Sequence, residues 1–436
     1  MKFYFKIIFV MILFGLISVV QAQQIKPDSL SLKEVINLTL TNQPLINQAI
    51  EQVNAEDAKI KEQKSNYYPQ VDGSLSYAWI GPIISLSFPG MGNFNFNTPN
   101  NYDMHVSAGY TLYDFGKREA GLDLIKSYKL SAEEKINLIK SNLSYSAIQT
   151  FYTILFLEKS INVTDDQINT LNKHLDVTKK KVITGSATDF DVLTTEVRIA
   201  SAQNAKIDLQ NALRKEKIYL QNLIGYNSEQ PFNLSGNFTL NEFNANEDSL
   251  IIQAYKMRPE IKLAKDAENS AKISQNLYSL GDRPTISIGA NYGLKNGFFP
   301  NLDVLRGNWA AAISVNIPIF NGYRTDAKVE EAEANLKSSS QEILSLERKI
   351  KTEVQSAYSD LQLNREKLAT TKLQVKQAEE AVSRAVVKYR DGVITNLDLI
   401  DAETTLAEAK LLYLQVIYKN LISKYALEKV IGTVVW

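Results

Sequence analysis

Residues 388–409 read KYRDGVITNLDLIDAETTLAEA, and several landmarks of this stretch have counterparts earlier in the chain. Gly392 and Thr395 repeat Gly185 and Thr188, with 207 positions between the members of each pair. The same offset relates three further pairs: Asp191 and Asp398, Glu196 and Glu403, Gly225 and Gly432. Similarity at a fixed offset indicates an internal duplication, so we expect two copies of one structural unit.

The duplication extends upstream with a slightly different offset. Pro44 and Pro69 recur as Pro259 and Pro284, and loops of unequal length absorb the difference. We therefore predict a first structural repeat over residues 23–225 and a second over residues 251–436. The polar stretch between them, residues 226–250, is predicted to be a small equatorial segment rather than a flexible linker.

The first 22 residues have the pattern of a secretory signal peptide. Lys2 and Lys6 precede the apolar run IIFVMILFGLISVV, which ends at the small-residue cleavage pattern before Gln23. The alternative, a membrane anchor, is less favoured because the run is shorter than the ~20 residues of a spanning helix.

Composition limits the classes of function. The chain has 48 basic and 48 acidic residues, so no charge excess points to nucleic acid. It has no cysteine and two histidines, which leaves little material for disulfides, a transition-metal site or a Ser-His catalytic pair. An enzyme is therefore disfavoured, and we predict no cofactor and no metal.

Each repeat is expected to contain a helix, two strands, a very long helix, a tight turn and a further helix. The first strands are predicted at residues 71–79 and 286–294, and the second strands around residues 106–112 and 313–319. Along each strand apolar residues alternate with small or polar ones, as in the wall of a transmembrane β-barrel. A half-buried strand in a soluble sandwich remains the alternative. The aromatic residues expected to form a girdle in the membrane are Tyr77, Trp79, Tyr110, Tyr292 and Trp309.

Four strands cannot close a barrel, and an open sheet edge in lipid leaves backbone groups unpaired. If the strands lie in a membrane, several copies must share one barrel. Three copies give twelve strands, an even number that leaves a water-filled lumen.

Two segments of 67 residues, 118–184 and 325–391, lack proline, and the only glycine in either is Gly121. Each predicts a helix of ~100 Å, with a coiled-coil seam of apolar residues in the second. Shorter helices over residues 43–67, 189–224, 258–282 and 396–431 are long enough to lie alongside them. A soluble rod-like coiled coil would explain these helices equally well but not the strands.

Together these features resemble the TolC family of outer-membrane efflux proteins. The motifs that carry the resemblance are FNGYR at residues 320–324, YDFGK at residues 113–117 and YRDGVITNLDLIDAETTL at residues 389–406. The resemblance implies a mixed α and β membrane protein: a homotrimer with a twelve-stranded outer-membrane β-barrel, continuous with a long α-helical barrel in the periplasm.

The resemblance also implies a function and partners. Such proteins are passive exit ducts of tripartite efflux pumps or type I secretion systems in Gram-negative bacteria. They work with a periplasmic adaptor and an inner-membrane transporter, and it is mostly that transporter that determines which substrate is exported. Residues 80–102 and 295–307 would be external loops, and Gly185 and Gly392 would mark the periplasmic turns. A secreted structural coiled coil or adhesin remains the alternative from another class.

The likeness further implies a gate. The family's aperture of two aspartate rings matches Asp398 and Asp401, and its latch between an aspartate and a tyrosine matches Asp191 and Tyr389. The arginine and threonine of a further latch contact are replaced here by Ile394 and Phe190.

The aspartates also have a purely structural interpretation. Both Thr395-x-x-Asp398 and Thr188-x-x-Asp191 fit a capping box at a helix start. Asp401 differs because the matching position in the first copy is Thr194, so a role specific to one turn is favoured there.

Overall fold

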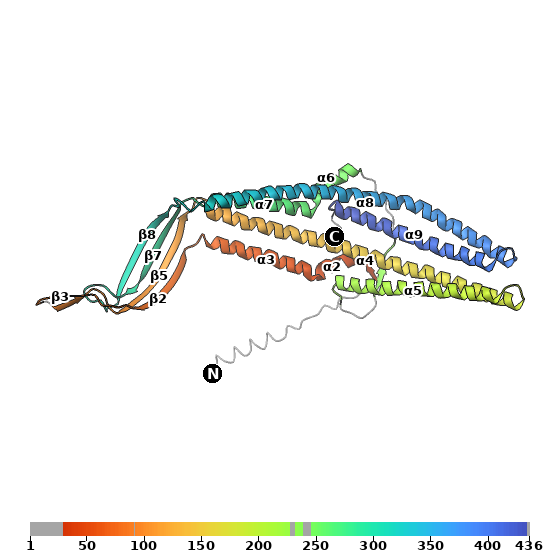
Figure 1. Ribbon diagram of the computed structural model, residues 1–436, viewed down its shortest axis with the longest axis horizontal. Coiled ribbons are helices and arrows are strands. Elements are labelled where there is room, and N and C mark those ends of the chain that lie inside the picture. The colour runs from red at the N-terminus through yellow and green to blue at the C-terminus, as the bar shows by residue number, and fades with distance from the viewer. Residues whose placement is uncertain (1–28, 91, 227–231, 239–245, 434–436) are drawn as a thin grey trace, which may run out of the picture.

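The computed structural model describes residues 29–90, 92–226, 232–238 and 246–433, so the predicted signal peptide lies outside the described residues. The molecule is elongated, with a β-sheet at one end and long helices running away from it to two turns at the other end (Figure 1). We call the end that carries these two turns the tip.

The two longest helices are α4 (Lys117–Ile183) and α8 (Arg324–Arg390), each of 67 residues. Both predicted long helices are confirmed, with boundaries one residue earlier. Shorter helices lie along them in pairs: α3 (Pro44–Ser65) and α5 (Asp189–Leu223) beside α4, and α7 (Pro259–Ser279) and α9 (Asn396–Val430) beside α8. Contacts of α4 with α7 and α9 join the two groups.

Two short helices were not expected. α2 (Leu32–Asn42) and α6 (Glu247–Met257) have 11 residues each and precede α3 and α7, whose first residue is proline. A proline at the first helical position lacks an N–H that would be unpaired anyway, so it marks a new helix start. In the described part of the segment between the repeats, β6 (Asn233–Ser235) pairs in parallel with β1 (Ser29–Ser31).

The main sheet has four antiparallel strands in the order β2-β5-β7-β8. Their bounds are Gln70–Trp79 for β2, Asn100–Tyr113 for β5, Thr285–Lys295 for β7 and Arg306–Asn316 for β8. The last strand was predicted too far along the chain. It ends before Ile317 because Pro318, which has no N–H, cannot extend the ladder.

The first predicted external loop contains structure of its own. Within residues 80–102, β3 (Ser85–Phe88) and β4 (Gly92–Asn95) form a two-stranded hairpin beyond the main sheet (Figure 1).

Sharp corners connect the sheet to the two long helices. Phe115 and Gly116 have φ values of 56° and 90°, and Gly322 and Tyr323 have values of 68° and 61°. Each corner thus needs two successive residues with positive φ, which a glycine adopts without strain. The YDFGK and FNGYR motifs are therefore the corners themselves.

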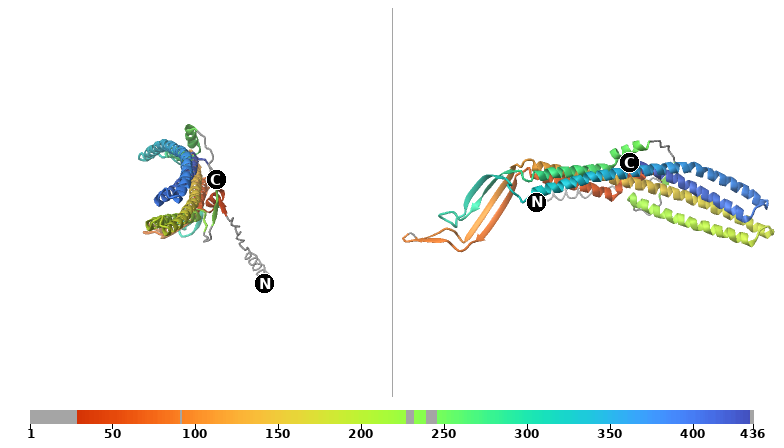
Figure 2. Two further views of the ribbon diagram at one scale, coloured as in Figure 1. Left: turned by 90° about the vertical axis from the view of Figure 1, so that its right-hand side faces the viewer. Right: turned by 45° about the horizontal axis from the view of Figure 1, so that its top comes forward.

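The largest apolar core lies at mid-length, where Phe151 and Ile154 of α4 are buried against α2 and the end of α5. Viewed end-on, the helices lie along an arc rather than around a solid centre (Figure 2). Among the described residues, none of the helices combines the length and hydrophobicity needed to cross a membrane.

Candidate functional site

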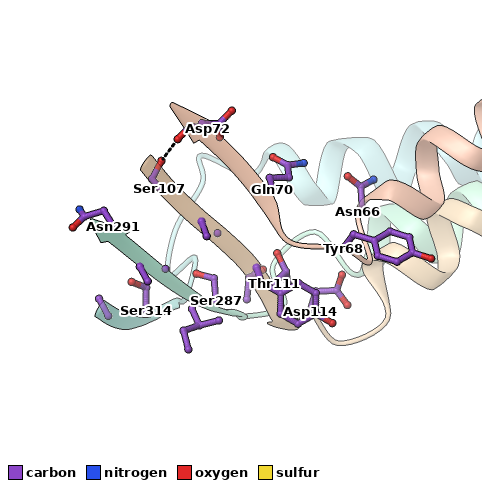
Figure 3. A pocket seen from close by; sticks show the side chains of 18 of the residues that line it. Asn66, Tyr68, Gln70, Asp72, Ser107, Thr111, Asp114, Ser287, Asn291 and Ser314 are labelled. Carbon is purple, nitrogen blue, oxygen red and sulfur yellow. Dashed lines mark hydrogen bonds between the residues drawn. The ribbon is translucent and has the colours of Figure 1, made fainter. Parts of the chain in front are cut away.

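One face of the main sheet is polar and hollow. Figure 3 shows this open hollow, which has a volume of about 770 Å³. Most of the strand residues that line it are small or polar, including Asp72, Ser107, Ser287, Asn291 and Ser314, and the large exceptions are Tyr110 and Ile288. Asp114, Lys117 and Arg118 close its helical end. This surface suits a water-filled passage better than an apolar ligand.

The opposite face is apolar and exposed. Paired residues in an antiparallel sheet share a face, and Val106, Tyr292 and Trp309 lie side by side on neighbouring strands. Trp79 and Trp309 are each 77% exposed, and the Tyr77 ring lies 5.1 Å from that of Tyr102. The predicted girdle residues Tyr77, Trp79, Tyr292 and Trp309 thus share this face, whereas Tyr110 also lines the hollow. Tyr110 is less exposed and lies near the helical end, where the Arg118 guanidinium is 5.9 Å from its ring centre.

Both edges of this sheet are open, because β2 and β8 each have a partner on one side only. A long apolar edge strand is a template for pairing with another chain.

At the tip, the two helix turns are built alike. Gly185 (φ 74°) and Gly392 (φ 76°) each follow the last helical turn in a left-handed conformation. Ser186 N–H donates to the Lys181 carbonyl and Val393 N–H to the Lys388 carbonyl, both at 2.8 Å. This is the hydrogen-bond pattern of a Schellman motif, in which glycine avoids the strain of positive φ.

The helices that follow start with the predicted capping boxes, which are confirmed. The Asp191 carboxylate accepts hydrogen bonds from the Thr188 N–H and hydroxyl, both at 2.8 Å. The Asp398 carboxylate accepts the equivalent bonds from Thr395 at 2.8 and 2.6 Å. The Thr395 hydrogen bonds lower the pKa of Asp398 below its ordinary value.

Asp401 has a partner that the sequence did not indicate. Its carboxylate lies 3.2 Å from the Arg198 guanidinium of α5, and both side chains are exposed. Arg198 therefore offsets part of the negative charge that Asp401 brings to the tip.

Tyr389 is buried but does not contact the Asp191 carboxylate within the chain. Its hydroxyl lies 3.3 Å from Thr178 Oγ1, and its carbonyl accepts a 2.7 Å hydrogen bond from Lys181 Nζ. The Lys181 ammonium also lies 4.1 Å from the centre of the tyrosine ring. Of the two residues that replace the arginine and threonine of the family's latch contact, Phe190 is 73% exposed and Ile394 packs on the small cluster around Tyr389.

A buried amide connects the two helical hairpins at this end. Asn396, the first residue of α9, donates from Nδ2 to the Asp191 carbonyl at 3.1 Å and to Thr195 Oγ1 at 3.3 Å. Its Oδ1 lies 2.6 Å from His174 Nε2 and 3.3 Å from Thr178 Oγ1. Sequence analysis did not single out Asn396 or His174.

A second buried polar group lies further along α9. Glu403 is 7% exposed, and its Oε2 has no hydrogen-bond partner among the described residues. Burial raises the pKa of Glu403 to about 7. Glu196, its counterpart in the first copy, is exposed and lies 3.2 Å from Lys179, whose own counterpart is Val386. Glu403 therefore lacks a basic partner at position 386, the counterpart of the position from which Lys179 pairs with Glu196.

No group of three or more His, Asp or Glu side chains in the described part of the chain could hold a metal ion.

These features agree with the comparisons to known proteins. The model of the outer membrane efflux protein family matches residues 35–226 and 250–433, and the chain belongs to this family. Outer membrane efflux protein BepC of Brucella suis is 22% identical over 385 residues, covering 87% of this chain and 80% of BepC. Cation efflux system protein CusC of Escherichia coli is 21% identical over 407 residues, covering 92% of this chain and 86% of CusC.

The fold agrees as well. A crystal structure of CusC superposes with a TM-score of 0.80 at 19% identity and covers 92% of both chains. The resemblance inferred from the turn and corner motifs is therefore confirmed.

Proposed function

We propose that three copies of this chain form a passive exit duct through the outer membrane and periplasm of a Gram-negative bacterium. In this proposal the duct serves a tripartite efflux pump or a type I secretion system. Its partners are a periplasmic adaptor and an inner-membrane transporter. The alternative, a secreted structural coiled coil or adhesin, gives no role to a sheet with one hollow polar face.

The observation that carries the proposal is the four-stranded sheet with two open edges and an exposed apolar face. In lipid, each unpaired backbone group at such an edge costs several kcal/mol, so both edges need partners. Pairing of β8 in one copy with β2 in the next closes a ring of three copies and twelve strands. The polar hollow then faces the lumen, and the aromatic face meets lipid.

The helical section supports the same assembly. Because the helices of one copy lie along an arc, three arcs can enclose a passage without a solid core (Figure 2). The tip then narrows this passage, and Asp398 and Asp401 from three copies would line it. Close carboxylates attract cations, and Arg198 moderates this charge through its 3.2 Å contact with Asp401.

Gating at the tip is part of the proposal. Asp191 and Tyr389 match the family's latch positions. In this chain Tyr389 contacts Thr178 and Lys181 of α4, which places a side chain of the second hairpin against the first. We propose that opening separates these hairpins.

Cysteine cross-linking tests the assembly directly, because the chain has no cysteine of its own. Pairs of single cysteines would be placed on β2 (Ser74 or Ser76) and β8 (Asn308, Ala310 or Ala312) and oxidised in intact cells. The proposal predicts a covalent ladder ending at a trimer in the outer-membrane fraction. Single variants should give at most dimers.

The absence of cross-linking would refute the proposed assembly. If every pair stays monomeric, or if the protein is found in the soluble fraction, the shared barrel is wrong. Cysteines on the central strands β5 and β7 provide the control, because the proposed assembly gives them no partner in another copy.

A further inference from the structure

The amide of Asn396 joins elements from both halves of one chain. It is 4% exposed, and both of its polar atoms are engaged: Nδ2 with α5 and Oδ1 with α4. Ile400 of α9 is also buried against Ile199 and Ala202 of α5, so the amide adds a polar contact to an apolar one. Removing a buried partner leaves polar groups unsatisfied, which destabilises the contact.

The arrangement is specific to one side of the tip. At the 207-residue offset, Asn396 matches Asp189, which is exposed, and His174 matches Ala381. Thr178 matches Ala385. The counterparts Asp189, Ala381 and Ala385 cannot form the same set of contacts, so these contacts are not a requirement of the repeated helix-turn-helix unit.

His174 is the member of this cluster that ordinarily titrates between pH 5 and 8. It is 6% exposed, and its ring centre lies 5.0 Å from that of Tyr389 on α8. A neutral imidazole that donates from Nε2–H to Asn396 Oδ1 fits the 2.6 Å distance. Burial has the largest influence and lowers the pKa of His174. The hydrogen bond to Asn396 acts in the opposite direction, and the nearby Lys181 ammonium lowers the pKa, so that the pKa lies below its ordinary value.

The other charged groups around the imidazole are few. Asp191 on α5 opposes the effect of Lys181, but its carboxylate is bound to Thr188. On α9, Asp398 is bound to Thr395. Protonation of His174 thus introduces a buried cation beside Lys181 without a carboxylate that is free to pair with it.

We propose that Asn396 and His174 form an acid-sensitive clasp, which holds α9 against the α4–α5 hairpin and releases it when the imidazole is protonated. The proposal rests on the proposed duct function, since α9 begins at the tip that would narrow the passage. The clasp itself lies within one chain.

The direction of the pH effect follows from proton binding. The clasped state binds fewer protons than the released state, in which His174 regains its ordinary pKa of 6.5. The clasp is therefore fully effective above pH 6.5 and weakens as the pH falls below that value. Glu403 acts in the opposite sense, because its carboxylate is neutral in acid and ionises as the pH rises through about 7.

Uptake of a neutral sugar by liposomes that contain the full-length protein tests the clasp, because an uncharged solute is insensitive to the aspartates. Every protein compared carries Glu403→Gln, which removes the opposing titration of Glu403 and serves as the reference background. We expect uptake to be faster at pH 5.5 than at pH 7.5, by up to about tenfold, the limit for one histidine one pH unit below 6.5. His174→Gln keeps an N–H donor but does not titrate, so its uptake should be slow at both pH values. Asn396→Ala should be fast at both.

His105→Gln is the matched control, since His105 is the other histidine of the chain and lies on β5. It should keep the response of the reference protein. A pH response that persists in His174→Gln, or a reference protein without one, would overturn the clasp while leaving the duct intact. Absence of uptake in all four proteins, together with absence of cross-linked trimers, would instead refute the duct.

Discussion

Glu403→Gln should make the start of α9 more resistant to local opening at alkaline pH. The side chain is 7% exposed, one carboxyl oxygen has no hydrogen-bond partner in the part of the chain that the structure describes, and the pKa is raised from 4.5 to about 7. Glu403 binds its proton more tightly when α9 is packed than when α9 is locally open. The stability of the packed state is therefore highest below pH 4.5 and falls until about pH 7. Above that pH the loss is complete.

The size of the effect follows from the rise in the pKa of Glu403. At ~1.4 kcal/mol per pH unit, the interval from 4.5 to about 7 corresponds to about 3 kcal/mol, which residual solvation reduces to about 1–2 kcal/mol. Glutamine has nearly the same shape but no charge. It should recover this energy at pH 8 and change little at pH 5.

Hydrogen exchange of the α9 amides near residue 403, corrected for intrinsic rates, measures local opening. At pH 8 we expect about 5- to 30-fold greater protection in Glu403→Gln than in the wild type. Glu196→Gln is the control, because its carboxylate is exposed beside Lys179. Equal protection of wild type and Glu403→Gln at pH 8 would refute the reasoning, as would an equal gain in Glu196→Gln.

Three other changes have defined outcomes. Arg198→Gln should raise cation over anion permeability in planar bilayers, by up to about fivefold, because an exposed ion pair with Asp401 is worth ~0.2–1 kcal/mol; an unchanged reversal potential contradicts this. Ile313→Lys should destabilise the assembly by about 2–4 kcal/mol, as a charge on the lipid face does. Its neighbour Ser314→Lys, on the hollow face, should tolerate the charge, so equal heat stability of the two trimers would exclude the assignment of faces. Gly392→Ala should lower the protection of the tip amides from hydrogen exchange by about 1–2 kcal/mol. The cause is the positive φ and not a steric clash, since no atom lies within 4 Å of the added Cβ.

The elements could be predicted from sequence wherever a local pattern fixes the structure. The long helices follow from stretches without helix breakers, and the capping boxes follow from threonine and aspartate three residues apart. The same reasoning missed α2 and α6, because each is only 11 residues long and continues almost directly into the next helix. It also extended β8 past Asn316, because apolar alternation continues where Pro318 ends the hydrogen bonding.

The polar contacts at the tip could not be predicted in the same way. Arg198 and Asp401 are 203 residues apart, and His174 and Asn396 are 222 apart. Their meeting depends on how far each hairpin extends and on the rotation of each helix about its axis. No single segment of sequence encodes either quantity.

The pairing of β5 with β7 has a consequence for biogenesis. Contacts at this junction join residues as distant as Asn100 and Asn296, which are 196 positions apart. Non-local pairing is slow because a long intervening chain must first be brought together. Because the chain is made from its amino terminus, β2 and β5 are complete well before β7 and present an exposed apolar surface. Aggregation is most favoured during this interval.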